Sequence, residues 1–381
     1  MKITDIETTV LRYPLPKPFA PSWTPGAVRL YNDAILVRVH TDEGITGVGA
    51  GIASYSRELA VAVEERIKPM LIGQDPLEIE WIFGILQGTT VMGHPHPWPV
   101  EIACWDIMGK KAGLPVWKLL GGHHEKLPAY ISTGALRSVE ERLDDLERFR
   151  EMGFKAVKLR FHHADPREDF KVLEAVRKRF NDDFTIMVDV NQGRVHKGKD
   201  PTGGWTFHTA LHVARELEQW DVYWMEEPLD MYNFEDLARL CDKVDIRIAG
   251  AELNSRMADF KAMLRLCSLD IYQPDAVYAG GILGLKKLAA AIELNDRVFT
   301  PHTWSNGIGL AANLHVSASV HRREFVEYPL ELDSWTAEAR DFMLTEPIGT
   351  DGEGNIVVPA GPGLGIQLDE EKVQKYAVAV K

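Results

Sequence analysis

Eight short apolar runs, each expected to form a strand, alternate with helical patterns over most of the chain after residue 127. The runs lie near 129–133, 155–160, 184–189, 222–226, 246–249, 269–273, 297–301 and 323–327. Between them lie segments with apolar residues at helical spacing, such as 139–152, 165–180 and 282–294. Strands that alternate with helices form a parallel sheet, and eight such strands predict a βα barrel. The predicted fold class is therefore α/β, with a (β/α)7-8 TIM-like barrel.

The remaining segments predict a second, smaller unit. Residues 1–125 mix expected strands and helices and are predicted to form an α+β capping domain. Residues 126–350 are expected to form the barrel, and residues 351–381 to return to the capping domain. Two stretches of the capping domain, 16–32 and 49–55, are too irregular for helices or strands, so we expect loops that cover the neighbouring site.

Three carboxylates follow three consecutive runs of the predicted barrel: Asp189, Glu226 and Glu252. The carboxyl ends of parallel strands meet at one end of a barrel, which is where its active site lies. A single acidic residue after a strand is commonly a helix N-cap. Three on neighbouring strands instead present the hard oxygen ligands that Mg²⁺ prefers. The sequence therefore predicts a site for one Mg²⁺ per subunit at this end of the barrel.

Further polar residues mark the other strand ends: Lys158, Arg160, Asn191, Asp275, His302 and Glu327. Lys158 and Arg160 are two positions apart, so both side chains point to the same side of their strand. If that side faced the helices, two charges would be buried against an apolar layer. We therefore expect both cations inside the barrel. His302, with Asp275 at the end of the preceding strand, has the pattern of a base and its orienting carboxylate.

Composition and charge exclude several kinds of partner. The chain has a formal net charge of -13 and lacks the basic stripe that a nucleic-acid surface needs. It has no apolar stretch of about 18 residues that would suit a membrane span, and its N-terminus lacks the apolar core of a signal peptide. Cys104, Cys241 and Cys267 are scattered, which indicates reduced thiols. We expect a cytoplasmic protein whose partner is a small molecule.

Five motifs follow the predicted strands in order: Gly153-Phe-Lys-Ala-Val-Lys158, Val188-Asp-Val-Asn-Gln192, Trp224-Met-Glu-Glu-Pro228, Gln273-Pro-Asp-Ala276 and Pro301-His-Thr-Trp304. Together they resemble the enolase superfamily, mandelate racemase subgroup. The likeness continues in the capping region through Ala103-Cys-Trp-Asp-Ile-Met-Gly109 and Leu119-Leu-Gly-Gly122. The resemblance implies a shared first step, abstraction of the proton α to a carboxylate to give an enediolate. It also implies a homo-oligomer, either a dimer or an octamer.

By this resemblance, Asp189, Glu226 and Glu252 bind Mg²⁺, which binds the substrate carboxylate. The metal offsets the negative charge that develops when the very weakly acidic α-proton leaves. His302 is then the general base, because an unperturbed imidazole pKa of ~6.5 suits neutral pH. Asp275 orients the imidazole and stabilises its charged form.

The resemblance also assigns a role to Glu327, which is expected to be protonated and to donate a hydrogen bond to the second substrate oxygen. This role requires a raised pKa. Lys158 is a further catalytic candidate, with its role as acid, base or bystander left open. One position departs from the subgroup. Many of its members carry Lys-x-Lys on this strand, whereas here the residue two positions after Lys158 is Arg160. Arginine keeps its proton, so it is a poor base but a good bidentate clamp for a carboxylate.

A reaction that needs only one base therefore fits the sequence better than racemisation, which needs acid–base groups on both faces of the α-carbon. His302 would remove the α-proton, and a β-hydroxyl group would leave with acid help. This predicts an acid-sugar dehydratase, a carbon–oxygen lyase that gives a 2-keto-3-deoxy acid. Cycloisomerisation, in which a ring oxygen leaves, is a related alternative, and a racemase or epimerase is another. A non-catalytic barrel is least favoured because every metal and dyad residue is present.

Substrate contacts are expected from two groups of residues. Arg160 and Asn191 lie at strand ends, and Trp23, Tyr55 and Trp304 could wall the substrate with aromatic faces. Ordinary packing between loop and barrel is an equally good account of the three aromatic residues. The expected substrate is a small-molecule carboxylate, in the first instance a sugar acid.

Overall fold

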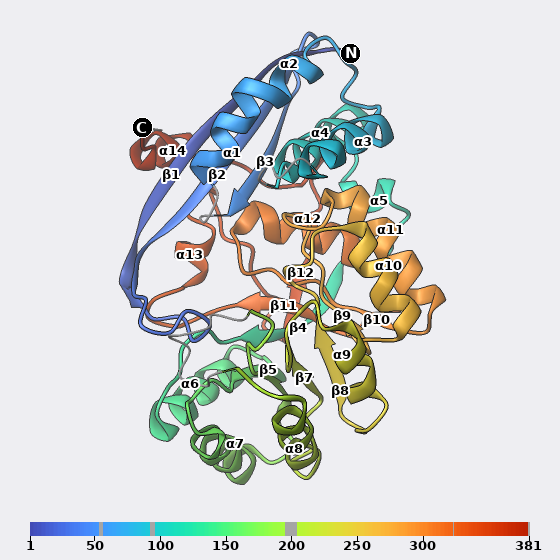
Figure 1. Cartoon of the computed structure of the whole chain (residues 1–381). Coiled ribbons are helices and arrows are strands. Elements are labelled where there is room, and N and C mark those ends of the chain that lie inside the picture. The colour runs from blue at the N-terminus through green and yellow to red at the C-terminus, as the bar shows by residue number, and fades with distance from the viewer. Residues whose placement is uncertain (53–55, 92–95, 195–203, 323, 380–381) are drawn as a thin grey trace.

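The structure is a computed structural model that describes residues 1–52, 56–91, 96–194, 204–322 and 324–379 (Figure 1). Its first part is an antiparallel sheet of three strands, β1 (Ile3–Phe19), β2 (Arg29–Thr41) and β3 (Thr46–Ile52). The helices that follow are α1 (Ser56–Ala62), η2 (Val63–Ile67), α2 (Lys68–Leu71), α3 (Ile79–Val91), α4 (Trp98–Ala112) and α5 (Val116–Leu119). The α+β character expected for this region is confirmed.

The prediction that 16–32 lacks regular structure is wrong for the two ends of that stretch, which belong to strands. β1 continues to Phe19, which is paired with Arg29 at the start of β2, so only 20–28 form the tip of a long hairpin. β1 is the edge strand of its sheet, and an edge tolerates prolines because it has a row of N–H groups that need no ladder partner. The register shifts beyond Pro14, in the proline-rich part of the strand.

The prediction for 49–55 is also wrong in part, because β3 runs to Ile52. The backbone at Gly49 packs so closely against α4 that a Cβ atom there would lie 1.9 Å from the carbonyl oxygen of Pro99. Glycine is therefore required here by close packing rather than by a loop. The rest of the stretch, including Tyr55, lies outside the described residues.

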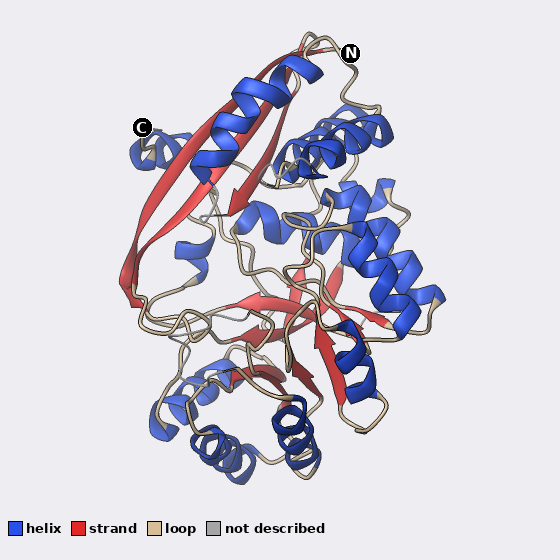
Figure 2. Ribbon diagram, viewed as in Figure 1, coloured by secondary structure: helices blue, strands red, loops and turns tan. Residues whose placement is uncertain are grey.

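The second part of the chain is a curled parallel sheet with its helices on the outer side (Figure 2). Its strands are β4 (Lys126–Ser132), β5 (Ala156–Arg160), β6 (Thr185–Asp189), β7 (Trp224–Glu226), β8 (Arg247–Gly250), β9 (Ile271–Tyr272), β10 (Val298–Phe299) and β11 (Val326–Pro329). The helices are α6 (Val139–Glu151), α7 (Pro166–Phe180), α8 (Phe207–Glu218), α9 (Phe234–Cys241), α10 (Met257–Leu266), α11 (Gly281–Leu294), α12 (Gly307–Ser317) and α13 (Ala337–Arg340).

The parallel ladder runs in the order β10-β9-β8-β7-β6-β5-β4-β11, which confirms the predicted eight strands of a βα barrel. Within the described residues no ladder joins β10 to β11. A side-chain contact spans this junction, where the Thr303 hydroxyl donates to the backbone oxygen of Glu327 at 3.0 Å. None of the helices in the described ranges is long and apolar enough to cross a membrane.

The C-terminal segment contacts both parts of the molecule. β12 (Asn355–Val357) pairs antiparallel with β4, and α14 (Glu370–Tyr376) lies beside β1 (Figure 1). Past α14, the N–H of Val378 donates to the backbone oxygen of Val10 at 2.9 Å. A buried carboxylate also joins the two parts, since Glu101 on α4 accepts hydrogen bonds from the first N–H groups of α11.

Candidate active site

The barrel interior contains an apolar layer with one side chain from each of seven neighbouring strands, β4 to β10. Its members are Tyr130, Ala156, Met187, Trp224, Ala249, Ile271 and Val298. Side chains two positions apart on a strand share a face. The next layer toward the carboxyl ends therefore contains the buried residues Ser132, Lys158, Asp189, Glu226 and Gln273. The polar groups of the site thus rest on a packed apolar floor.

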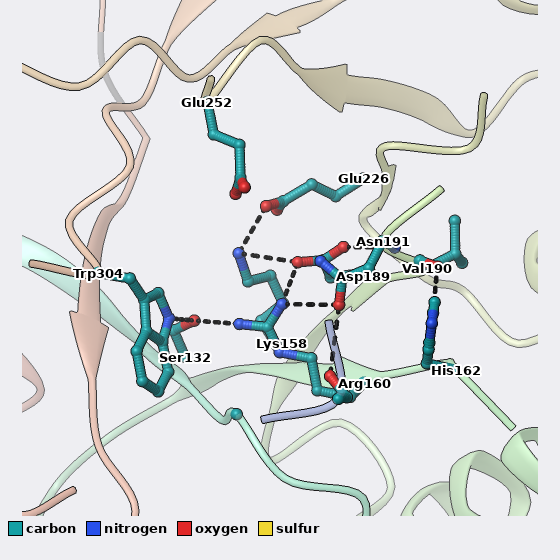
Figure 3. A network of polar contacts seen from close by, with 12 residues as sticks. Ser132, Lys158, Arg160, His162, Asp189, Val190, Asn191, Glu226, Glu252 and Trp304 are labelled. Atoms are coloured by element: carbon teal, nitrogen blue, oxygen red, sulfur yellow. Dashed lines mark hydrogen bonds and ion pairs between the residues drawn. The ribbon is translucent and has the colours of Figure 1, made fainter. Parts of the chain in front are cut away.

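The three predicted metal ligands converge in this layer (Figure 3). Asp189 and Glu226 end neighbouring strands and are paired in register, while Glu252 follows shortly after β8. One oxygen from each carboxylate lies within 4.8 Å of the other two. Gln273 orients Glu226 by donating a hydrogen bond to its Oε2 at 2.8 Å. The convergence expected from the strand ends is confirmed.

Lys158 and Arg160 also point into this layer (Figure 3). Nζ of Lys158 lies 2.7 Å from Oε1 of Glu226 and 3.7 Å from Oδ2 of Asp189. Arg160 forms an ion pair with Asp189 and donates to the backbone oxygen of Thr133. Burial alone would lower the pKa of Lys158, but the carboxylates around it raise that pKa above its usual value. The expectation that both cations face the interior is confirmed.

The charges of the layer fit a divalent cation. Four buried carboxyl groups, those of Asp189, Glu226, Glu252 and Glu327, face two buried cations. Burial raises the pKa of Glu226 to about 7, although Lys158 opposes the rise. Buried charge without a counter-ion is strongly destabilising. A divalent cation at the three converging oxygens would balance the layer, and an all-oxygen set suits a hard ion such as Mg²⁺.

His302 and Asp275, just after β10 and β9, form the predicted pair. Nδ1 of His302 lies 2.9 Å from Oδ2 of Asp275, whose Oδ1 accepts a hydrogen bond from Asn313 at 2.9 Å. Nε2 of His302 faces the carboxylate layer, 3.4 Å from Oε2 of Glu252. Burial alone would lower the pKa of His302, but Glu252, Glu327 and Asp275 raise it to about 10. The basicity of the imidazole therefore depends on the charge of these carboxylates.

The prediction that Glu327 is protonated is wrong for this arrangement. Its Oε1 lies 2.9 Å from Nζ of Lys158, and its Oε2 accepts a hydrogen bond from the backbone N–H of Thr303 at 2.6 Å. Burial alone would raise the pKa of Glu327, but Lys158 and His302 lower it well below the usual range. Glu327 is an ionised partner of Lys158 rather than a hydrogen-bond donor.

A pocket lies above this layer, between the barrel and the β1–β2 hairpin. Its lining residues are Trp23, Arg29, Asn32, Asp33, Ile52, Arg160, Asn191, Arg194, Glu252, Tyr278, His302, Trp304, Ser305 and Trp335. Trp23 and Trp304 meet edge to face with ring centroids 4.9 Å apart, and Phe19 stacks on Trp304 at 5.8 Å. Trp23 and Trp304 thus line the pocket and also pack between the hairpin and the barrel, and their contact with a substrate stays a prediction.

Several lining residues were missed by the sequence reasoning, notably Arg29, Arg194 and Tyr278. Arg194 lies only three positions after Asn191 in the loop that leaves β6, where the strand-end rule could have found it. Arg29 gave no signal, because its strand was predicted to be part of an irregular loop.

Two family models match the chain over most of its length. One, described as the mandelate racemase/muconate lactonizing enzyme N-terminal domain, matches residues 6–121, and one described as enolase C-terminal domain-like matches residues 141–372. The chain belongs to the enolase superfamily. Its relatives include the arabinonate dehydratase of Saccharolobus solfataricus, which is 30% identical over 357 residues that cover 90% of each chain.

Other enolase-superfamily members resemble the whole chain. The 3,6-anhydro-alpha-L-galactonate cycloisomerase of Streptomyces coelicolor is 30% identical over 99% of both sequences. The crystal structure of a racemase from Streptomyces coelicolor A3(2) with bound magnesium covers 99% of this chain and all of its own, with a TM-score of 0.86 and 28% identity. The fold and the two-part organisation are thus those of this enolase-superfamily branch.

Proposed function

We propose that this protein is a Mg²⁺-dependent enzyme that removes the proton α to a carboxylate and then eliminates water from an acid sugar. The observation that carries the proposal is the position of His302. Its Nδ1 faces Asp275 at 2.9 Å, and its Nε2 faces the carboxylate layer near Glu252. A base oriented in this way, beside a metal-ligand set, is suited to deprotonate a carbon next to a bound carboxylate.

Asp189, Glu226 and Glu252 would hold the Mg²⁺, which when bound supplies positive charge for the substrate carboxylate and for the enediolate. Lys158 adds a fixed positive charge beside the metal-ligand carboxylates, because its ammonium group is buried among them and stays protonated. Charge placed in advance where negative charge will develop lowers the barrier without later reorganisation.

His302 would carry both proton transfers. Once a divalent cation offsets the carboxylate charge that raises the pKa of His302, the imidazole would be neutral, with Nδ1–H donating a hydrogen bond to Asp275 and the Nε2 lone pair free to take the α-proton. The resulting imidazolium can return that proton to the β-hydroxyl on the same side, so that the β-carbon–oxygen bond breaks and water leaves. The enol product then tautomerises to the 2-keto-3-deoxy acid.

Arg160 supports a reaction with one base. Its guanidinium is buried, ion-paired with Asp189 and hydrogen-bonded to Thr133, so it cannot accept a proton. Lys158, the other cation of β5, is paired with Glu226 and Glu327. Neither side chain offers the second base that racemisation needs, which favours elimination.

Cycloisomerisation is the second candidate. The same residues would act, and the leaving group would be a ring oxygen instead of a hydroxyl group. The observation in its favour is the cycloisomerase of Streptomyces coelicolor, which matches the chain from end to end at 30% identity.

The test is proton NMR of the Mg²⁺-loaded protein in D₂O with a panel of aldonic acids, aldaric acids and their lactones. A 2-keto-3-deoxy product supports the dehydratase, and loss of a ring ether or lactone without released water supports the cycloisomerase. Failure to exchange any α-proton across the panel, with no effect of chelator on stability, would contradict both.

A further inference from the structure

Three guanidinium groups line the pocket: Arg160 from the barrel, Arg194 from the loop after β6, and Arg29 from the β1–β2 hairpin. Two of them have carboxylate neighbours, since Arg160 pairs with Asp189 and Nη2 of Arg194 lies 4.0 Å from Oε1 of Glu252. Among the described residues, no carboxylate lies within ion-pair distance of Arg29. The hairpin therefore presents to the pocket a cation that has no ion pair among the described residues.

The acidic lining residue on the same strand as Arg29 is already engaged. Asp33 lines the pocket too, but Arg12 binds both of its oxygens, at 2.8 Å and 2.7 Å. Arg29 is half-buried, and its guanidinium lies over the ring of Trp23, 5.8 Å from the centroid. Burial lowers the pKa of Arg29 and Arg194 adds to this effect, while Tyr278 and Asp33 oppose it. A desolvated charge without a partner is unfavourable, so this position suits a counter-ion that comes from outside the chain.

The position of Trp23 connects this cation to the inner end of the pocket. Arg160 also lies over the Trp23 ring, with 4.8 Å between its guanidinium carbon and the ring centroid. One indole thus contacts an inner cation of the barrel layer and an outer cation of the hairpin. Arg29 and Arg194 face the same space, where an anion would relieve the repulsion between them.

We propose that Arg29 and Arg194 form a second anion subsite on the hairpin side of the pocket, and that the substrate is a dicarboxylate. The inference rests on the proposed function for the first carboxylate, which the barrel layer would hold. The second carboxylate lies at the far end of the carbon chain. An arginine fork binds a carboxylate through two parallel hydrogen bonds, so aldaric acids are preferred over aldonic acids of the same configuration.

The kinetic test compares galactarate with galactonate as matched substrates, and Arg29→Gln with Lys17→Gln as matched variants. Lys17 lies on the same hairpin and is exposed, and it pairs with Asp333 outside the pocket lining. We expect the wild type to prefer the dicarboxylate in kcat/KM. Arg29→Gln should reduce this preference about 10- to 100-fold, mainly through KM, as expected for a lost charge-assisted hydrogen bond. Lys17→Gln should leave the preference unchanged, and Arg29→Lys should restore part of it.

A binding test is independent of turnover. Calorimetry with glutarate and butyrate, neither of which has a β-hydroxyl group, should show tighter binding of glutarate to the wild type and a loss of this difference in Arg29→Gln. If no sugar acid reacts, but the wild type still binds glutarate more tightly than butyrate and Arg29→Gln does not, the subsite stands and the proposed reaction fails. If sugar acids react with no dicarboxylate preference, or if a 6-phosphoaldonate is preferred to galactarate, the dicarboxylate assignment is overturned while the proposed reaction stands.

Discussion

Asn313 donates a hydrogen bond from its side-chain amide to Oδ1 of Asp275, at 2.9 Å, and it does so from helix α12 rather than from a strand end. The same amide donates to the backbone oxygen of His302 at 3.0 Å. One side chain therefore positions both members of the dyad. Its own oxygen accepts the backbone N–H of Ala276, so its orientation is fixed on both sides.

Replacement of Asn313 by alanine should lower kcat with little effect on KM, because Asp275 loses a partner that holds it toward the imidazole. We expect a fall of about 10- to 100-fold, which is typical for loss of a residue that orients a catalytic group. Steady-state kinetics will measure the changes in kcat and in KM separately. The exposed Asn295 at the end of α11 gives the control variant Asn295→Ala, which should behave as wild type. An unchanged kcat in Asn313→Ala would contradict the positioning role.

Replacement of Glu252 by glutamine should separate metal binding from stability. In the metal-free protein the variant removes one of four crowded carboxylates, so its Tm should equal or exceed that of the wild type. Added Mg²⁺ should raise the Tm of the wild type but not of the variant, because binding to the folded state is stabilising only where the ligands are complete. Thermal denaturation with and without Mg²⁺ measures both effects, and Glu346→Gln, at an exposed site, is the control. A metal-dependent rise in the variant would contradict the assignment of Glu252.

The stability of the protein should fall as the pH falls from about 6.5 to about 4, in part through His315. This buried imidazole accepts the N–H of Trp117 at 3.1 Å, and its Nε2 contacts the backbone oxygen of Leu364 at 3.0 Å. Burial lowers the pKa of His315 to about 4, so the folded state resists protonation that the unfolded chain accepts. The contribution of His315 to the free energy of unfolding is complete at a pH above its pKa in the unfolded chain. It decreases by about 3 kcal/mol in total as the pH drops to its pKa in the folded state.

Urea unfolding of wild type and His315→Gln at several pH values checks this expectation. The difference in unfolding free energy between the two should shrink as the pH falls through this window. His212→Gln is the control, because His212 is 81% exposed and its loss should not alter the pH dependence. A constant difference between wild type and His315→Gln would show that His315 is not a source of the acid sensitivity.

Replacement of Glu101 by alanine should destabilise the junction between the two parts of the molecule. Its carboxylate accepts hydrogen bonds from the indole of Trp105 at 2.8 Å and from the N–H groups of Ile282 and Leu283 at 2.8 Å and 2.9 Å. Loss of the acceptor leaves three donors unsatisfied, two of them buried, and we expect a cost of about 3 kcal/mol in unfolding free energy.

A surface ion pair that also joins the capping region to α11 provides the control for Glu101. Glu80 of α3 pairs with Lys287 of α11 at 2.6 Å, but Glu80 is 71% exposed. Exposed ion pairs contribute about 0–1 kcal/mol. Denaturant unfolding of Glu80→Ala should therefore show a small change, and an equal loss in both variants would contradict the account of Glu101.

The sequence was most informative where one local rule fixed the geometry. Because side chains alternate along a strand and parallel strands end together, Asp189, Glu226 and Glu252 could be placed at one site from their spacing alone. The protonation of Glu327 could not be predicted, because it depends on how near Lys158 of another strand approaches. Asn313 reaches the dyad from a helix, and Arg29 reaches the pocket from a distant hairpin, so neither follows from the strand-end rule.

The most direct test of the central claim, that His302 is the only base at the α-carbon, is NMR of a partially converted sugar acid in D₂O. The wild type should return substrate that carries deuterium at the α-carbon with its original configuration, alongside the 2-keto-3-deoxy product. His302→Asn should lose both exchange and elimination by on the order of 10³-fold or more. Deuterated substrate of inverted configuration, or exchange that survives in His302→Asn, would contradict the claim and show that a second base acts on the opposite face.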